Sequence, residues 1–343
     1  MAIVRGTDAS DPELEGTGVA DQIFGYGGND ILIGVDGDDI LEGGAGADQL
    51  FGSTGFDYAS YRGSSSAVFV DANGIQAGDA AGDQLYSIEG IIGSAFGDVL
   101  GSLDIGDQRN VLRGEGGADI LFGRGGNDLL DGGSGNDNLN GGQGADELRG
   151  GSGADRLDGG GSADKLLGGA GFDVAWYQSA SGGVRVDLAA GTGSGGDAEG
   201  DRLSGIEGVQ GSGFNDHLSG NEQGNLLIGG QGADILTGRG GADKFAYITT
   251  FESTAAASDR IIDFSRSQGD KIDLAAIDAN ELVVGDQAFR FIGTGQFTAV
   301  GQIRCYQEDG DTVIEANTRD DPGAEMRIVL DPLLSLQAGD FLL

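Results

Sequence analysis

The sequence has few of the residues on which disulfides, zinc chemistry and nucleophilic catalysis depend. Its 343 residues include one cysteine, one histidine, one tryptophan, two methionines and three prolines. The single Cys305 excludes an internal disulfide. The single His217 excludes a zinc protease with an H-E-x-x-H motif, and neither G-x-S-x-G nor a P-loop is present. Catalysis by a pair of carboxylates stays open, and we expect His217 to be an exposed strand residue.

Basic residues and long apolar runs are scarce as well. Lys and Arg number 19 against 56 Asp and Glu, which gives a formal net charge of −37. This charge disfavours nucleic acid and anionic membrane surfaces as partners. No run approaches the roughly 18 apolar residues of a transmembrane helix, and the N-terminal residues lack the pattern of a signal peptide. We therefore predict no nucleic-acid partner and no transmembrane segment.

Glycine is abundant, with 70 residues, of which only eight follow Ala246. The residues up to Ala246 are therefore about one-quarter glycine, and the rest has the composition of an ordinary globular sequence. This shift predicts a domain boundary near residue 246. Such glycine content and negative charge also predict that the first part is unfolded without metal.

The glycines belong to nine-residue repeats with Asp in a fixed position. Residues 114–176 contain seven units without a break, from GEGGADILF to GGAGFDVAW. Two positions after each Asp stands an apolar residue that we expect to face the interior: Leu121, Leu130, Leu139, Leu148, Leu157, Leu166 and Ala175. Because one nonamer is too short to bury a core, the units must stack, which predicts a solenoid.

The residue types of each unit also predict a metal site. Glycine permits backbone angles that other residues avoid and leaves carbonyl oxygens uncovered. Carboxylate and carbonyl oxygens at about 2.3 to 2.6 Å are the ligands of Ca²⁺, which accepts six or more. The last three residues of each nonamer fit a short strand with one side chain inward. We predict a solenoid whose turns bind calcium.

The repeats fall into three blocks that are separated by a duplicated segment. The segment that begins at Gly55 matches the one that begins at Gly171, so that Val68-x-Val70-Asp71 aligns with Val184-x-Val186-Asp187. The V-x-V-D alternation predicts a strand, and we expect either a longer coil or a small hairpin at each insertion. Irregular units around Asp98 and Asn110 are expected to break the register.

After Ala246 the pattern is that of ordinary short strands. Residues 259–274 predict two strands around a turn, and further strands are expected from Phe289, Gln302, Thr312 and Met326. Turns are expected at Asp309-Gly310 and Pro322-Gly323. We predict a β cap that covers the open end of the solenoid, whose edge would otherwise invite aggregation.

The nonamers resemble those of the RTX (repeats-in-toxin) proteins. GADKFAY at Gly241, followed by SDRIIDFSRSQGDKIDL, is similar to the C-terminal domain that serralysin-type proteases share with related type I secreted proteins. The ending Asp340-Phe341-Leu342-Leu343 resembles the uncleaved secretion signal of that group. The resemblance implies an all-β fold: a parallel β-roll with two nonamers per turn and calcium between hexads eighteen residues apart, ending in a C-terminal β cap. It also implies export by the type I secretion machinery and an extracellular location.

These observations divide the chain into eight predicted segments. They are a lead-in (1–15), RTX block 1 (16–60), insertion 1 (61–92), degenerate repeats (93–113), RTX block 2 (114–176), insertion 2 (177–210), RTX block 3 (211–246) and the C-terminal cap and secretion-signal domain (247–343).

The implied β-roll places the repeat carboxylates in two stacked rows in each block. Pairs of neighbouring hexads give three, five and two sites in the three blocks, or about ten calcium ions. Val19, Ser162, Asn110 and Asn225 depart from the motif and predict weaker or empty sites. The candidate ligands are Asp21, Asp30, Asp39, Asp48, Asp57, Asp98, Asp119, Asp128, Asp137, Asp146, Asp155, Asp164, Asp173, Asp216, Asn225, Asp234 and Asp243.

Three functions fit this pattern. The favoured one is a secreted, non-catalytic calcium-binding protein with a structural, surface or adhesive role. The alternative is a polysaccharide-active enzyme or its accessory module, related to alginate epimerases or lyases, although the residues before Gly16 leave no room for a catalytic domain. A third is calcium-bridged adhesion to anionic glycans at the cell surface, with Tyr61, Trp176 and Tyr177 as sugar-stacking side chains.

Overall fold

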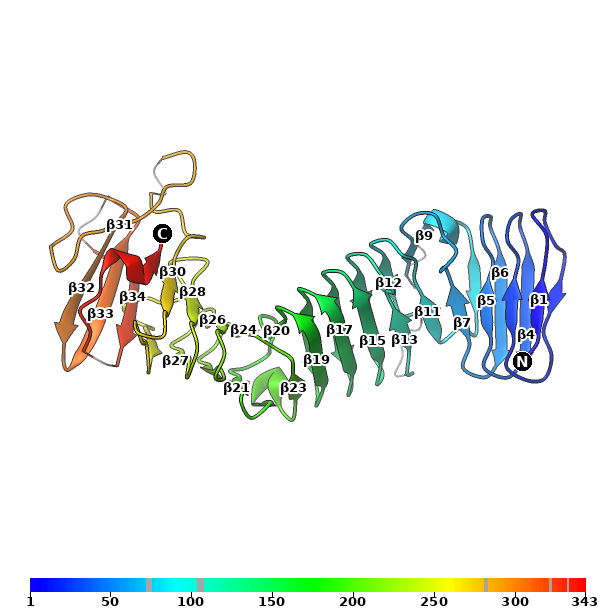
Figure 1. The fold of residues 1–343 in the computed structure, drawn as a ribbon, viewed down its shortest axis with the longest axis horizontal. Coiled ribbons are helices and arrows are strands. Elements are labelled where there is room, and N and C mark those ends of the chain that lie inside the picture. The colour runs from blue at the N-terminus through cyan, green and yellow to red at the C-terminus, as the bar shows by residue number, and fades with distance from the viewer. Residues whose placement is uncertain (72–75, 104–107, 281–282, 321–322, 332) are drawn as a thin grey trace. The chain divides into compact units, whose positions relative to one another are not determined.

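The computed structural model describes residues 1–71, 76–103, 108–280, 283–320, 323–331 and 333–343. In these residues the regular structure consists of short β-strands and three 3-10 helices (Figure 1), so the all-β prediction is confirmed. The chain forms two compact units, Met1–Asp173 and Val174–Leu343. The finer division into eight segments stays a prediction. Within the described ranges, no helix has the length and apolar character needed to span a membrane.

The first unit is a stack of coils whose strands alternate along the chain between rows of parallel strands (Figure 1). The predicted insertion 1 (61–92) contains the 3-10 helix η1 (Gly78–Ala80), and its strand β9 (Gln76–Ala77) pairs antiparallel with β8 (Phe69–Val70). One row consists of β1 (Ile3–Arg5), β3 (Gln22–Phe24), β5 (Ile40–Glu42), β7 (Tyr58–Ser60), β11 (Gly90–Ile92), β13 (Val111–Arg113), β15 (Leu129–Ser134), β17 (Glu147–Gly153) and β19 (Lys165–Gly171). The others consist of β2 (Leu14–Glu15), β4 (Ile31–Asp36), β6 (Gln49–Thr54) and β10 (Gln84–Tyr86), and of β8 (Phe69–Val70), β12 (Val99–Gly101), β14 (Ile120–Phe122), β16 (Asn138–Gln143) and β18 (Arg156–Gly161).

The register of these strands shows two nonamers per coil. Leu130 lies opposite Leu148, and Leu148 opposite Leu166, each eighteen residues further along the chain. These leucines are fully buried, as the sequence predicts. Each buried leucine contributes about 1.5 to 3 kcal/mol through loss of apolar surface from water. The interior column of leucines therefore holds the coils together, and the parallel β-roll is confirmed.

The second unit contains parallel rows of the same kind and an antiparallel sheet. It also has the 3-10 helices η2 (Gly196–Ala198) and η3 (Ala338–Asp340). Its rows are β21 (Arg185–Asp187), β25 (His217–Ser219), β27 (Ile235–Thr237), β29 (Asp259–Ile261) and β34 (Met326–Leu330), and β20 (Val174–Trp176), β24 (Gly208–Gln210), β26 (Leu226–Ile228), β28 (Lys244–Ala246), β30 (Lys271–Asp273) and β35 (Phe341–Leu342). The remaining strands are β22 (Thr192–Ser194), β23 (Arg202–Ser204), β31 (Arg290–Phe291), β32 (Gln302–Glu308) and β33 (Asp311–Asn317).

The two duplicated insertions have the same layout. In each, the strand predicted from V-x-V-D joins a parallel row: β8 pairs with β12, and β21 pairs with β25. The next strand turns back antiparallel, as β9 and β22. A Gly-Asp-Ala 3-10 helix follows, η1 in the first and η2 in the second. Each insertion is therefore a longer coil that includes a hairpin, so both of the predicted alternatives are present.

The prediction that the irregular units break the register is wrong. Val99 lies opposite Ile120 in the β12–β14 pair, and Val111 lies opposite Leu129 in the β13–β15 pair. The pairing continues because strand register depends on the three-residue strands, whereas the loops between them can differ in length. The lead-in also belongs to the solenoid, since β1 pairs with β3 and β2 pairs with β4.

The C-terminal strands confirm the predicted cap. β29 and β30 continue the parallel rows of the second unit. β34 then pairs with the free edge of β29, and β35 pairs with that of β30. A turn at Asp309-Gly310 joins β32 and β33, which pair antiparallel. The predicted turn at Pro322-Gly323 lies partly outside the described residues.

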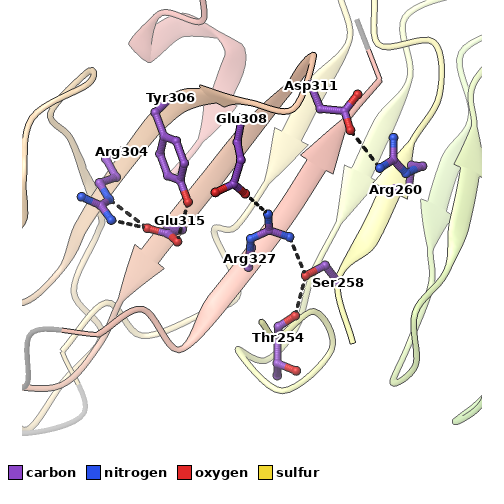
Figure 2. A network of polar contacts seen from close by, with 9 residues as sticks. All are labelled: Thr254, Ser258, Arg260, Arg304, Tyr306, Glu308, Asp311, Glu315 and Arg327. Carbon is purple, nitrogen blue, oxygen red and sulfur yellow. Dashed lines mark hydrogen bonds and ion pairs between the residues drawn. The ribbon is translucent and has the colours of Figure 1, made fainter. Parts of the chain in front are cut away.

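A polar network lies on the sheet β32–β34 (Figure 2). Arg304 binds Glu315 with two nitrogens, at 2.6 and 2.8 Å, and Arg327 binds Glu308 at 2.5 Å. Arg260 of β29 donates to Asp311 of β33 at 2.9 Å. These contacts pair the charges of neighbouring strands and tie the antiparallel sheet to the parallel row.

Candidate metal centres

The seventeen candidate ligands are all buried. Each is at most 3% exposed, although Asp and Asn are normally surface residues. An isolated aspartate is usually a solvated turn residue, and the burial of these side chains excludes that role at each position. His217, by contrast, is exposed on β25, as the sequence predicts.

The buried side chains form rows in which each one binds the backbone of the preceding coil. The backbone N–H of Asp119 donates to Oδ1 of Asp137, and the N–H of Asp137 donates to Oδ1 of Asp155, both at 2.9 Å. All such bonds between predicted ligands, and the one from Asn110 to Asp128, measure 2.7 to 2.9 Å. The rows are Asp21, Asp39, Asp57; Asp30, Asp48; Asp98, Asp119, Asp137, Asp155, Asp173; Asn110, Asp128, Asp146, Asp164; Asp216, Asp234; and Asn225, Asp243.

The second carboxylate oxygen of the interior aspartates has no hydrogen-bond donor. It is buried and unbonded in Asp30, Asp39, Asp48, Asp57, Asp119, Asp128, Asp137, Asp146, Asp155, Asp234 and Asp243. A buried carboxylate oxygen without a partner is costly, and native structures satisfy such groups with a donor, water or a cation.

The glycine five residues before each Asp leaves room beside this oxygen. A Cβ on Gly132 would lie 2.4 Å from Oδ2 of Asp137 and 2.8 Å from the carbonyl oxygen of Gly150, in the next coil. The same arrangement recurs at Gly114, Gly141 and Gly150. In the described residues, no group of three or more His, Cys, Asp or Glu side chains is arranged so that it could hold a metal ion. The available donors are thus aspartate oxygens and hexad carbonyls, which fit calcium as a hard cation.

Asp21, Asp98 and Asp216, each the first of its row, are different, because the protein satisfies both oxygens of each carboxylate. Oδ2 of Asp98 accepts from the N–H of Ser94 at 2.6 Å, and its Oδ1 accepts from Val68 and from the Ser94 hydroxyl, both at 2.8 Å. Asp216 has the equivalent partners Ser212 and Val184. Asp21 accepts from Ala2 and Thr17. In these three hexads, a Ser or Thr in the second position donates to the carboxylate of the same hexad.

Burial raises the pKa of the interior carboxyl groups. It brings the pKa of Asp48 and Asp146 to about 6 and that of Asp119 and Asp128 to about 7. The pKa of Asp234 rises to about 9, through burial and then the neighbouring Asp259 carboxylate. The cause is that a charged carboxylate loses hydration and has no cation beside it. These carboxylates therefore favour either a proton or a positive ion.

The rows contain members that the sequence analysis missed. Asp11 precedes Asp30, and Asp83 follows Asp48. Glu89 follows Asp57, Asp259 follows Asp234, and Asp270 follows Asp243. Gly6 and Gly78, five residues before Asp11 and Asp83, repeat the hexad spacing and could have identified these two. The other three have no such signal.

The suggested sugar-stacking role of Tyr61 and Tyr177 is wrong. Each is 2% exposed, and its hydroxyl donates to a buried carboxylate, at 3.1 Å to Asp83 and at 2.8 Å to Asp201. Neither ring has a face open to a sugar. Trp176 is half-buried.

Comparison with known proteins agrees with this geometry. Residues 24–59, 104–139 and 140–175 match the RTX calcium-binding nonapeptide repeat (4 copies), and residues 201–334 match the peptidase M10 serralysin C-terminal domain. The fold and these matches define a calcium-binding β-roll. The chain therefore contains RTX calcium-binding nonapeptide repeats and a domain that matches the serralysin C-terminal domain.

No curated protein matches the chain in sequence. Among solved structures, it is similar to the AlgE6R3 subunit of the Azotobacter vinelandii mannuronan C5-epimerase, at 22% identity over 58% of this chain and 80% of that chain, with a TM-score of 0.25.

Proposed function

We propose that this chain is a secreted protein whose repeats fold on binding about ten calcium ions outside the cell, and that it serves a non-catalytic structural, surface or adhesive role. The observation that carries the proposal is the row of buried aspartates whose Oδ2 atoms have no donor. The ligands would be the interior aspartates and the carbonyl oxygens of the hexads. Bound calcium would supply the positive charge that these carboxylates lack.

The free energy of calcium binding is large enough to control folding. Extracellular calcium modules bind with dissociation constants of about 0.1 to 1 mM. A ligand at ten times its dissociation constant adds about 1.4 kcal/mol per site, so ten sites add on the order of 14 kcal/mol. This equals the whole stability of a typical domain, about 5 to 15 kcal/mol. Submicromolar cytosolic calcium would leave such sites empty.

Removal of calcium tests the proposal directly. We expect the chelator-treated chain to be expanded and to lose the β-sheet circular dichroism of its first 246 residues, and millimolar calcium to restore both. The measurements are far-ultraviolet circular dichroism and small-angle X-ray scattering, with bound calcium counted by equilibrium dialysis. A chain that keeps its spectrum and radius in chelator would overturn the proposal.

The C-terminus supports export before folding. Asp340 is buried and accepts from Nε of Arg266 at 2.9 Å, and Phe341 is buried in β35 beside β30. Asp340 and Phe341, two residues of the ending that resembles a secretion signal, are therefore exposed only while the chain is unfolded. Co-expression with a type I exporter tests this: deletion of residues 340–343 should keep the chain inside the cell, and secretion of the shortened chain would contradict it.

The non-catalytic role has its own test. Calcium-loaded protein is incubated with alginate and other acidic polysaccharides, and uronate double bonds and epimerised residues are measured. We expect no product. Product formation would replace the non-catalytic role with the polysaccharide-active alternative, whereas chelator-sensitive binding without product would assign an adhesive role.

A further inference from the structure

Two hexads have Asn where the others have Asp, and in both the next hexad of the same row has Arg in its second position. Asn110 is followed in its row by the hexad of Asp128, which contains Arg124. Asn225 is followed by the hexad of Asp243, which contains Arg239. Both arginines have positive φ, 71° and 69°, where glycine is the usual residue. The substitution follows both copies of the duplicated segment, once in each unit.

The asparagines donate where aspartate cannot. Nδ2 of Asn110 donates to the carbonyl oxygen of Glu89 at 3.2 Å, and Nδ2 of Asn225 donates to that of Glu207 at 3.1 Å. Oδ1 of Asn225 occupies the place of the unbonded Oδ2, since a Cβ on Gly220 would lie 2.4 Å from it and 2.6 Å from the Gly238 carbonyl oxygen. Asn225 therefore places a neutral oxygen where the other hexads have a carboxylate oxygen.

The arginines reach back across the preceding coils. Arg239 binds both oxygens of Asp187, from Nη1 at 2.8 Å and from Nη2 at 2.6 Å, and its Nη1 also donates to the carbonyl oxygen of Gly220 at 2.9 Å. In the first unit, Arg124 pairs with Asp71 and donates to the carbonyl oxygen of Ser102 at 3.4 Å.

These contacts span three successive coils. Asp187 ends β21, and Gly220 follows β25, which pairs with β21. Arg239 follows β27, which pairs with β25 on its other side. Asp71, Ser102 and Arg124 stand in the same order after β8, β12 and β14. Each arginine thus ties the first strand of an insertion to the array that follows.

We propose that Arg124 and Arg239 are built-in cations that replace bound calcium where each insertion joins the next array. A guanidinium is permanently charged and offers five N–H donors in a planar fork, so it can bind a carboxylate and a carbonyl oxygen at once. Because the neighbouring hexad has Asn in place of Asp, the site it would form with Asp128 or Asp243 takes no calcium. The inference rests on the proposed calcium binding of the other hexads. It lowers the predicted number of calcium ions bound by RTX block 3 from two to one.

The first experiment removes the charge. In calcium-saturated full-length protein, Arg239→Gln should speed amide hydrogen exchange in β21 at least tenfold, and Arg124→Gln should do the same in β8. The number of bound calcium ions should not change. The control is Arg149→Gln, since Arg149 is 47% exposed and pairs with Glu147 two residues away on its own strand. Unchanged exchange in β21 and β8 would overturn the proposal.

The second experiment restores the motif. Asn225→Asp restores the carboxylate, and Arg239→Gly places glycine in the second position of the neighbouring hexad. The double variant should bind one calcium ion more than the wild type by equilibrium dialysis. Exchange in β21 should return toward the wild-type rate. A double variant with the wild-type number of ions would contradict the proposal. Wild-type protein that binds no calcium would instead refute the proposed function, and the exchange experiment would still test the arginine contacts.

Discussion

At the scale of single residues, the aspartate of each hexad explains why its first residue, five positions earlier, is glycine. Gly132→Ala places a methyl group against Oδ2 of Asp137 and the Gly150 carbonyl oxygen. We expect a loss of about 1 to 3 kcal/mol in the free energy of unfolding, because overpacked sites must shift backbone or side chains. Calcium-saturated urea unfolding measures it. Gly213→Ala is the control, since no atom lies within 4 Å of the added Cβ, and it should change stability by less than about 0.5 kcal/mol.

The interior aspartates also predict how calcium binding depends on pH. In the metal-free fold, burial raises the pKa of Asp119 and Asp128 to about 7, above the ordinary value of 3.8. A raised pKa means that the fold binds protons more tightly than the unfolded chain. The carboxyl groups thus support the metal-free fold below about pH 4, and this support is lost as the pH rises through 7.

Calcium competes with those protons, because its ligands must be deprotonated. The calcium concentration at the folding midpoint should therefore fall as the pH rises from 5.5 to 7.5, and calcium binding should release protons. Calorimetry in two buffers of different ionisation enthalpy counts the protons. A midpoint that is the same at both pH values, with no protons released, would contradict the raised pKa values.

At the scale of elements, each array of coils ends at a tyrosine four residues after an aspartate of the repeat. Tyr61 and Tyr177 follow Asp57 and Asp173, and their hydroxyls bind Asp83 and Asp201. Tyr61→Phe leaves Oδ2 of the buried Asp83 without its donor, which should cost about 1 to 3 kcal/mol. Urea unfolding in saturating calcium measures this cost. Tyr86→Phe is the control, because this ring is half-exposed and its hydroxyl binds Gln84, and it should cost less than about 0.5 kcal/mol. Equal losses of stability in the two variants would contradict the role of Tyr61 in stabilising the end of the array.

The sequence predicts the rows of carboxylates well wherever their members are eighteen residues apart. It fails where loop length varies, since 35 residues separate Asp48 from Asp83 and 25 separate Asp234 from Asp259. A row is defined in space by strand pairing, and a longer loop changes the spacing in sequence without changing the register. The same reason explains why the strands that follow Asp98 and Asn110 stay in register with the neighbouring coils. The partners of Tyr61 and Arg239 depend on side-chain direction, which no spacing reveals.

At the scale of the whole molecule, calcium could act through site coordination or through general neutralisation of charge. The net charge is −37, and ten calcium ions carry twenty positive charges, so they would bring it to about −17. Neutralisation alone would make monovalent salt an effective substitute, since the Debye length falls to about 3 Å at 1 M. The buried position of the carboxylates argues for coordination, because screening by mobile ions acts mainly on exposed charges.

The two mechanisms differ in their response to other ions. We expect millimolar calcium to restore the β-sheet spectrum of chelator-treated protein, and 1 M sodium chloride to leave it unfolded. Magnesium should be much less effective at the same concentration, because it keeps its own water and demands a smaller octahedral site than these carbonyl-rich turns offer. Circular dichroism in the three salts makes the comparison. If sodium chloride restores the spectrum, charge repulsion alone opposes folding; if only calcium does, the aspartate rows act as specific sites.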